Sequence, residues 1–209
     1  STVDAGGAVT LGNVTSADLA VTAGGNITQV AATALVVTGT TTLTSDAAAI
    51  SATLANTGNN FGTVALASSG AGSFTSASIT DTNALSVGGN AGTLTADAGG
   101  TLAFTGGSYT TLNGTAGGNI SQTGALTVSG TTTLTSDAAA ITATLEEAND
   151  FGTVALVSAG AGSFTSVSVT DTNGLIIGGN AGTLTADAGG TLAFTGGSYT
   201  TLNGTAGGN

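Results

Sequence analysis

The chain contains a long internal duplication, which limits the folds open to it. Residues 61–119 return almost letter for letter as residues 151–209, a shift of 90 positions. Within this unit one apolar position recurs at a nearly constant interval and is followed by Thr in six of its seven occurrences. Such a fixed step is typical of a solenoid, in which each repeat buries its apolar side by stacking on the next.

Two markers keep the same step along the whole chain. We expect the apolar marker to form one continuous core ladder along the solenoid axis, made of Leu11, Leu43, Phe74, Phe104, Leu134, Phe164 and Phe194. The second marker is an Asn beside small or polar residues, at Asn26, Asn59, Asn90, Asn119, Asn149, Asn180 and Asn209. In this arrangement the rings of Phe74 and Phe104, and those of Phe164 and Phe194, should stack on each other in the core.

Each step of about 30 residues divides into three short runs of alternating apolar and polar residues, closed by Gly or Asn. Residues 92–99, 100–107 and 108–118 show this division most clearly. We therefore predict an all-β fold, a parallel β-helix solenoid with three strands per coil of about 30 residues and about seven coils.

The repeat runs through the full length, so we expect residues 1–209 to form a single β-solenoid. It divides into a partial unit 1–41, a repeat unit 42–131 and a second, incomplete unit 132–209. The copies differ in length only at residues 55–60 against 146–150. Because a one-residue difference would disturb a strand register, this segment should be a corner.

The charge composition excludes several classes of partner. The sequence has no Lys, Arg or His and 11 Asp and Glu residues, which gives a net charge of −11. Nucleic-acid binding depends on Lys and Arg, and anionic membranes also attract basic residues, so neither partner is expected. No apolar run approaches the roughly 20 residues that span a bilayer, so membrane insertion is not expected either.

The acidic residues recur in phase with the repeat, and solvated corner positions that aid solubility are the favoured interpretation. The alternative is that Asp81, Asp97, Asp171 and Asp187 bind Ca²⁺ together with backbone carbonyls. The repeat pattern Gly-Gly-x-Gly-x-Asp of Ca²⁺-binding β-rolls is absent. No cofactor is implied.

An enzyme is not expected from these residues. Paired carboxylates can cleave glycosides, but the chain has no His, Lys, Arg or Cys to serve as base, oxyanion clamp or nucleophile partner. Thr-x-Thr segments such as 42–44, 93–95 and 133–135 are compatible with ice binding. On the predicted three-stranded coil, however, segments 73–75 and 103–105 would interrupt the row of Thr pairs. A binding module for carbohydrate, Ca²⁺ or ice on an outer face therefore stays the alternative function.

The run at residues 128–141, with residues 148–154 and 169–173, resembles the central repeats of filamentous haemagglutinin-like exoproteins. The resemblance covers nearly the whole chain, although the family's amino-terminal secretion domain and its cell-attachment tripeptide have no counterpart in this sequence. It implies a right-handed β-helix from a large bacterial adhesin exported by two-partner secretion.

From the repeat and this resemblance we expect a secreted or cell-surface structural segment, a stiff stalk or fibre body. The expected partners are further copies of the chain, stacked end to end through strand edges, and a host or neighbouring-cell surface. The resemblance identifies no receptor site.

Overall fold

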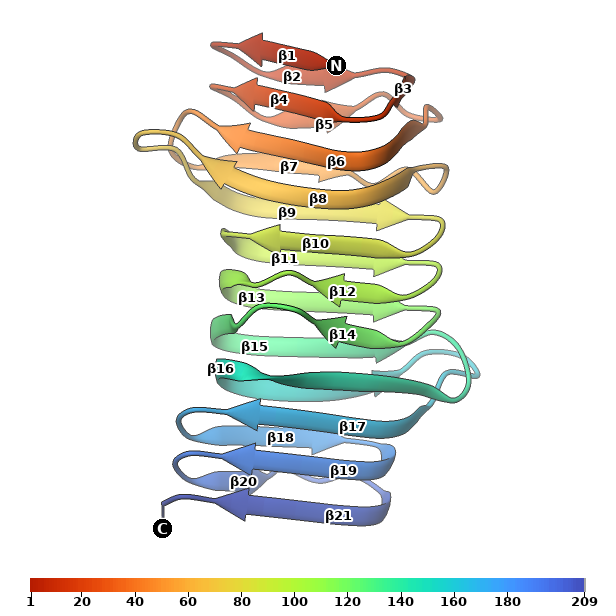
Figure 1. Ribbon diagram of the computed structural model, residues 1–209, viewed down its shortest axis with the longest axis vertical. Coiled ribbons are helices and arrows are strands. Elements are labelled where there is room, and N and C mark those ends of the chain that lie inside the picture. Colours follow the sequence, from red (N-terminus) through yellow and green to blue (C-terminus); the bar gives the residue numbers. More distant parts are fainter. Residues whose placement is uncertain (209) are drawn as a thin grey trace.

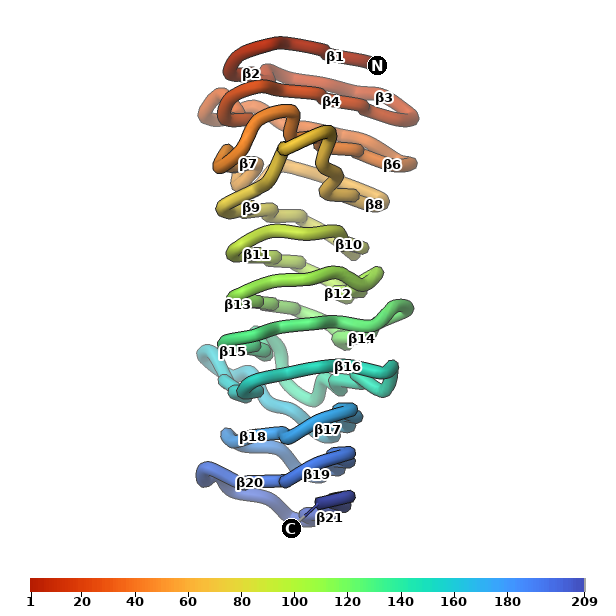
Figure 2. The backbone as a smooth tube through the Cα atoms, turned by 90° about the vertical axis from the view of Figure 1, so that its left-hand side faces the viewer, coloured from red at the N-terminus to blue at the C-terminus, as the bar shows by residue number. Residues whose placement is uncertain are grey.

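The computed structural model describes residues 1–208, which form a parallel β-solenoid with two strands in each coil (Figures 1 and 2). The strands of the two sheets, A and B, run in opposite directions across the solenoid, and each strand pairs in parallel with the strands of the coils before and after it. The chain winds about ten times. At a spacing of about 4.8 Å per coil, the rod is about 48 Å long.

Sheet A lies nearer the viewer in Figure 1. In stacking order it contains β1 (Thr2–Ala5), β4 (Leu19–Ala23), β6 (Leu35–Ser45), β8 (Asn60–Ser68), β10 (Leu85–Gly89), β12 (Leu102–Phe104), β14 (Ile120–Gln122), the first part of β16 (Ile141–Ser158), β17 (Phe164–Asp171), β19 (Ala181–Ala188) and β21 (Tyr199–Ala206). The short strand β3 (Val14–Ser16) pairs with the start of β6.

Sheet B faces sheet A across the core. It contains β2 (Val9–Leu11), β5 (Ile27–Gln29), β7 (Ile50–Leu54), β9 (Phe74–Asp81), β11 (Ala91–Ala98), β13 (Gly107–Ala116), β15 (Leu126–Ser136), the last part of β16, β18 (Leu175–Gly179) and β20 (Leu192–Phe194).

The all-β, parallel solenoid is confirmed, but the predicted coil is wrong. One coil brings Leu85 beside Leu102, and a longer one brings Ile120 beside Ala143. Coils are therefore shorter than the step of the sequence markers and contain two strands, not three, and there are about ten of them instead of seven. Each marker step divides into thirds because it spans about one and a half coils, and these contain three strands.

The apolar marker alternates between the two sheets for the same reason. Phe74 lies in sheet B beside Ile50, whereas Phe104 lies in sheet A beside Val87. The prediction that Phe74 stacks on Phe104 is therefore wrong, and Phe164 and Phe194 likewise belong to opposite sheets. Six of the seven marker residues are nevertheless buried in the core that the sheets share: Leu11, Leu43, Phe74, Phe104, Leu134 and Phe164. The seventh, Phe194, is 39% exposed in the last turn.

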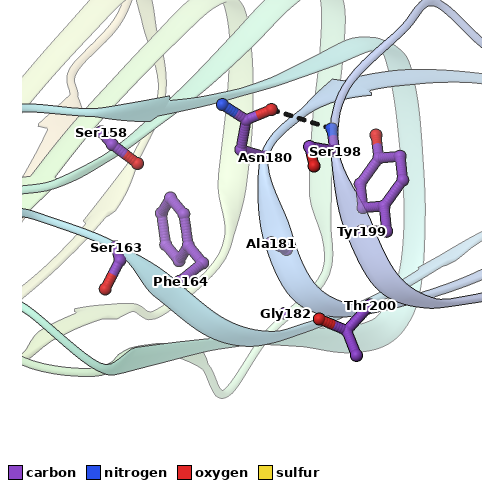
Figure 3. Close-up of a pocket in the computed structure, with 9 residues that line it drawn as sticks. All are labelled: Ser158, Ser163, Phe164, Asn180, Ala181, Gly182, Ser198, Tyr199 and Thr200. Atoms are coloured by element: carbon purple, nitrogen blue, oxygen red, sulfur yellow. Dashed lines mark hydrogen bonds between the residues drawn. The ribbon is translucent and has the colours of Figure 1, made fainter.

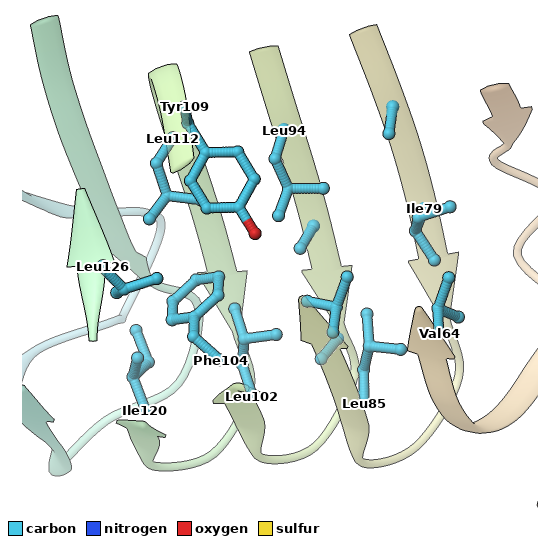
Figure 4. Packing of buried hydrophobic residues seen from close by; sticks show 14 of the residues in the cluster. Val64, Ile79, Leu85, Leu94, Leu102, Phe104, Tyr109, Leu112, Ile120 and Leu126 are labelled. Atoms are coloured by element: carbon cyan, nitrogen blue, oxygen red, sulfur yellow. The ribbon is translucent and has the colours of Figure 1, made fainter. Parts of the chain in front are cut away.

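Large and small residues face each other across this core. Phe104 extends from sheet A among Leu102, Leu112 and Leu126 (Figure 4). Opposite it in sheet B is Gly114, where a β-carbon would come within 2.8 Å of the ring. Gly114 thus leaves the space that the Phe104 ring fills, and close packing of this kind makes the core sensitive to changes in volume.

The internal duplication corresponds to about four and a half coils, so the two copies occupy opposite sheets. Val64 lies in sheet A and its counterpart Val154 lies in sheet B. The loops at 46–49 and 69–73 project from one edge of the solenoid, and their counterparts at 137–140 and 159–163 project from the other (Figure 1). The copies are related by half a turn about the axis combined with a shift along it.

We expect Phe104→Ala to lower the free energy of unfolding by about 3–5 kcal/mol, because the core cannot collapse into the space between Phe104 and Gly114. The matched control is Phe194→Ala, which changes the same local sequence at a position that is 39% exposed. Chemical denaturation of both variants measures the difference. If both variants lost the same free energy of unfolding, the packing of the Phe104 ring against Gly114 would add nothing to stability.

Candidate functional site

The four candidate Ca²⁺ ligands do not form a shared site. Asp81 is 2% exposed, and the next strand of the same sheet carries Asp97 on its outer surface. Because these residues point to opposite sides of sheet B, their carboxylates do not converge. Asp171 and Asp187 repeat the arrangement in sheet A. Among residues 1–208, no group of three or more Asp, Glu, His or Cys side chains is placed to hold a metal ion.

The buried carboxylates bind backbone amides of the chain itself. Asp81 accepts hydrogen bonds from the N–H of Phe61 at 2.5 Å and the N–H of Asn83 at 2.6 Å. Asp171 accepts the corresponding bonds from Phe151 at 2.5 Å and Asn173 at 2.7 Å. The interpretation of these two residues as solvated corner carboxylates is therefore wrong. Each caps two backbone amides at a turn, at equivalent positions of the two copies.

Burial and hydrogen bonding change the pKa of the Asp81 carboxyl group in opposite directions. Burial raises the pKa of its carboxyl group, and the two backbone N–H donors lower it by less, so the pKa stays above its ordinary value of 3.8. This carboxyl group therefore holds its proton more tightly in the folded chain than in the unfolded one.

Buried amides lie at the same edges as these carboxylates. Asn59 is fully buried and exchanges two hydrogen bonds with Gln29, at 2.7 and 3.0 Å. Asn149 forms the same pair with Gln122, at 2.8 and 2.9 Å. We call the two sets the corner clusters: Gln29, Asn59 and Asp81 at one edge, and Gln122, Asn149 and Asp171 at the other.

The Asn marker of the sequence has a structural role that sequence reasoning did not assign. Each of its six described members accepts a backbone N–H from an adjacent coil: Asn26 from Ser51, Asn59 from Leu35, Asn90 from Ser108, Asn119 from Thr142, Asn149 from Leu126 and Asn180 from Ser198. The seventh member, Asn209, lies outside the described residues. The markers thus connect neighbouring coils at the edges of the solenoid.

Two equivalent clefts open at opposite edges. The larger, of about 380 Å³, is lined by residues that include Phe164, Asn180, Ser198 and Tyr199 (Figure 3). The other, of about 290 Å³, is lined by their counterparts Phe74, Asn90 and Ser108. In the first copy, Tyr109 is buried and burial raises the pKa of its hydroxyl well above the ordinary value. The clefts contain hydroxyl and amide groups but no charged side chain, so they offer hydrogen bonds and no acid or base.

The outer faces carry rows of side chains, most of which carry the hydroxyl groups of Ser and Thr. In sheet B, six successive strands present a pair of outward residues, and we call these pairs array B: Ser51/Thr53, Ser76/Ser78, Thr93/Thr95, Thr111/Asn113, Thr131/Thr133 and Thr153/Ala155. Array A is the counterpart in sheet A: Thr142/Thr144, Ser166/Ser168, Thr183/Thr185 and Thr201/Asn203.

The expectation that segments 73–75 and 103–105 interrupt the Thr rows is wrong. Segment 103–105 belongs to the opposite sheet, and segment 73–75 lies at the start of β9, before its array pair. The expectation rested on the longer, three-stranded coil. With the shorter coils of this structure the pairs fall in register.

Replacing Asp81 with Asn should lower the free energy of unfolding by about 1–3 kcal/mol, because an amide offers one acceptor oxygen where two N–H groups need partners. Asp187→Asn removes the same charge from an exposed position and should change stability by less than about 0.5 kcal/mol. Urea denaturation at neutral pH tests the pair. Similar losses for both variants would mean that net charge, and not amide capping, determines the result.

The chain should become more stable as the pH falls from neutrality toward the ordinary pKa of an Asp carboxyl group. Asp97 lies on the outer surface of sheet B, but neighbouring atoms exclude part of the water around its carboxyl group, which raises its pKa, and the negative charge of Asp137 raises the pKa further. A carboxyl group with a raised pKa binds its proton more tightly in the folded state, so protonation increases the free energy of unfolding.

Thermal unfolding between pH 7 and pH 4 measures this dependence. Asp137→Asn should weaken the dependence of stability on pH and raise stability at pH 7. The control is Glu147→Gln, which makes the same change of charge at another exposed residue. A loss of stability on acidification of the unmodified chain would contradict the expectation.

Comparison with known proteins agrees with the repeat architecture. The family model described as repeats of unknown function (DUF5649) matches residues 1–68 and 91–158, two segments offset by the length of the duplication. No curated protein and no solved structure gives a significant match. No helix among residues 1–208 is long and apolar enough to cross a membrane. Because the two matched segments cover more than half of the chain, this protein belongs to the DUF5649 family of repeats of unknown function.

Proposed function

We propose that the chain is a stiff structural segment of a bacterial surface or secreted protein, the body of a stalk or filament. The observation that supports this function is the continuous pairing of coils: sheet A and sheet B each extend from the first coils to the last. Bending or stretching such a rod requires breaking several parallel backbone hydrogen bonds in a coil at once. Length then depends on the number of repeat units.

A repeat unit can be added or removed without disturbing strand pairing at the junction, as a spacer of variable length requires. Residues 61–68 in β8 and 151–158 in β16 have nearly the same sequence and the same inward and outward pattern, although they lie in different sheets. A further unit would therefore find matching strands at its junction. A filament could grow from many such units in one chain or from copies stacked end to end.

The C-terminal coil offers a surface for such continuation. Phe194 and Leu202 are 39% and 44% exposed there, and within residues 1–208 β21 pairs only with β19. We propose that a second copy of the chain, stacked end to end, covers these side chains. The adhesin role, with a host or neighbouring cell as target, is part of the same proposal and rests on the sequence resemblance.

Deleting residues 61–150 tests the spacer function. It joins Asn60 to Phe151 and should shorten the rod by about 22 Å, which is four and a half coils at the strand spacing, with an unchanged cross-section. Duplicating residues 61–150 is the matched control and should lengthen the rod by the same amount. Small-angle X-ray scattering measures both values. A globular particle, or a length that does not follow the number of units, would exclude the stalk.

A further inference from the structure

Array B is a two-dimensional lattice of side chains on the outer face of sheet B, bordered on one side by a further outward column that includes Thr80, Asp97 and Thr115. Its two columns are two residues apart on each strand, so they are separated by about 6.6 Å, and successive strands repeat about every 4.8 Å. The second column pairs without a break from Thr53 to Ala155. In the first column Ser51 pairs with Ser76, Ser76 with Thr93, and Thr93 with Thr111, and a register irregularity follows between Tyr109 and Leu112. The order therefore comes from the backbone ladder and does not depend on contacts between the side chains.

The lattice is neutral although the chain is strongly acidic. No member of array B carries a charge, while the whole chain has a net charge of −11. Among residues 1–208, the one hydrogen bond that uses an array B hydroxyl joins Asn113 Nδ2 to Thr95 Oγ1 at 3.5 Å. The other hydroxyls are free to bond outward, and the Thr members also present a methyl group beside each hydroxyl.

We propose that array B binds the surface of ice, a function beyond that of a structural stalk. Its two repeat distances are close to those between oxygen atoms on the faces of hexagonal ice. Regular hydroxyls can join an ordered water layer, because bridging waters are nearly as favourable as direct hydrogen bonds. The methyl groups hold the remaining water of that layer in a cage around them. Neutrality matters because a charged side chain would keep its own hydration shell; within the two columns of array B there is none, and Asp97 stands in the bordering column.

Other occupants fit this face less well. A protein partner needs large anchoring side chains such as Trp, Tyr or Arg at its centre, and array B contains none of these. A sugar platform uses stacked aromatic rings, but Tyr109 is buried in the core. A phosphate or carboxylate ligand would find no cation, because the chain has no Lys, Arg or His.

The half-turn relation between the copies provides a second lattice on the opposite face. Thr93 and Thr95 of array B correspond to Thr183 and Thr185 of array A in the second copy. In array A the Ser168 hydroxyl donates a hydrogen bond to the Glu146 carboxylate, and the other pairs would give the rod a second face that binds ice. Removing the activity requires a change in each array.

The test uses the intact chain and bulky substitutions at exposed positions. Thr95→Tyr projects a ring from the middle of array B, and Thr185→Tyr does the same in array A. The unmodified chain should be incorporated into a slowly growing ice hemisphere and should slow ice recrystallisation. Each single variant should retain part of this activity, and the double variant should lose it, with unchanged circular dichroism and thermal unfolding.

The double variant Thr57→Tyr/Ala148→Tyr is the matched control, because both residues are exposed in the corner that the two copies share. It should keep the full activity. Exclusion of the unmodified chain from ice would overturn the proposal, as would equal activity in the array and control variants. Retention on microcrystalline cellulose or chitin without incorporation into ice would also overturn it and would assign the arrays to a polysaccharide.

Discussion

Backbone hydrogen bonding between successive coils is the interaction on which this structure depends. The chain has no basic side chain, so no ion pair between side chains contributes to the fold. Pairing between coils continues around the corners, where the N–H of Gly24 donates to the carbonyl of Ala5 and that of Gly117 to the carbonyl of Ala98, both at 2.9 Å. Such close stacking leaves no room for a side chain at Gly24, whose β-carbon would lie 2.5 Å from the Gly6 carbonyl oxygen. Small corner residues are therefore a condition for the ladder to continue.

The sequence was sufficient to predict parallel strands, an apolar core and a solenoid, because period-two alternation and a fixed step are direct results of strand geometry and stacking. It was not sufficient to predict the length of a coil or the number of strands in it. A strand in either of the two facing sheets needs the same alternation of inward apolar and outward polar residues. The same sequence pattern can therefore return after a whole coil or after half a coil. Phe74 and Phe104 illustrate this ambiguity: they share a pattern and a buried environment, yet they lie in opposite sheets. The spacing of the markers was correctly observed, but it measures one and a half coils.

The side-chain roles show the same limit. Asp81 and Asp97 are both acidic residues in repeated positions, and composition alone treats them alike. The structure separates them, because one points inward to cap two amides and the other points outward beside Asp137. Adjacent positions on a strand face opposite ways, so distinguishing them required the strand register, which depends on the coil length. The Thr rows were visible as Thr-x-Thr pairs, but whether they lie side by side also depends on that length.

The half-coil offset between the copies has a consequence for whatever is attached to such a rod. Each additional repeat unit rotates everything that follows it by half a revolution about the long axis. Two modules at either end of an array would thus point the same way or opposite ways according to whether the number of units between them is even or odd. Gain or loss of a single unit during evolution would therefore change orientation as well as reach.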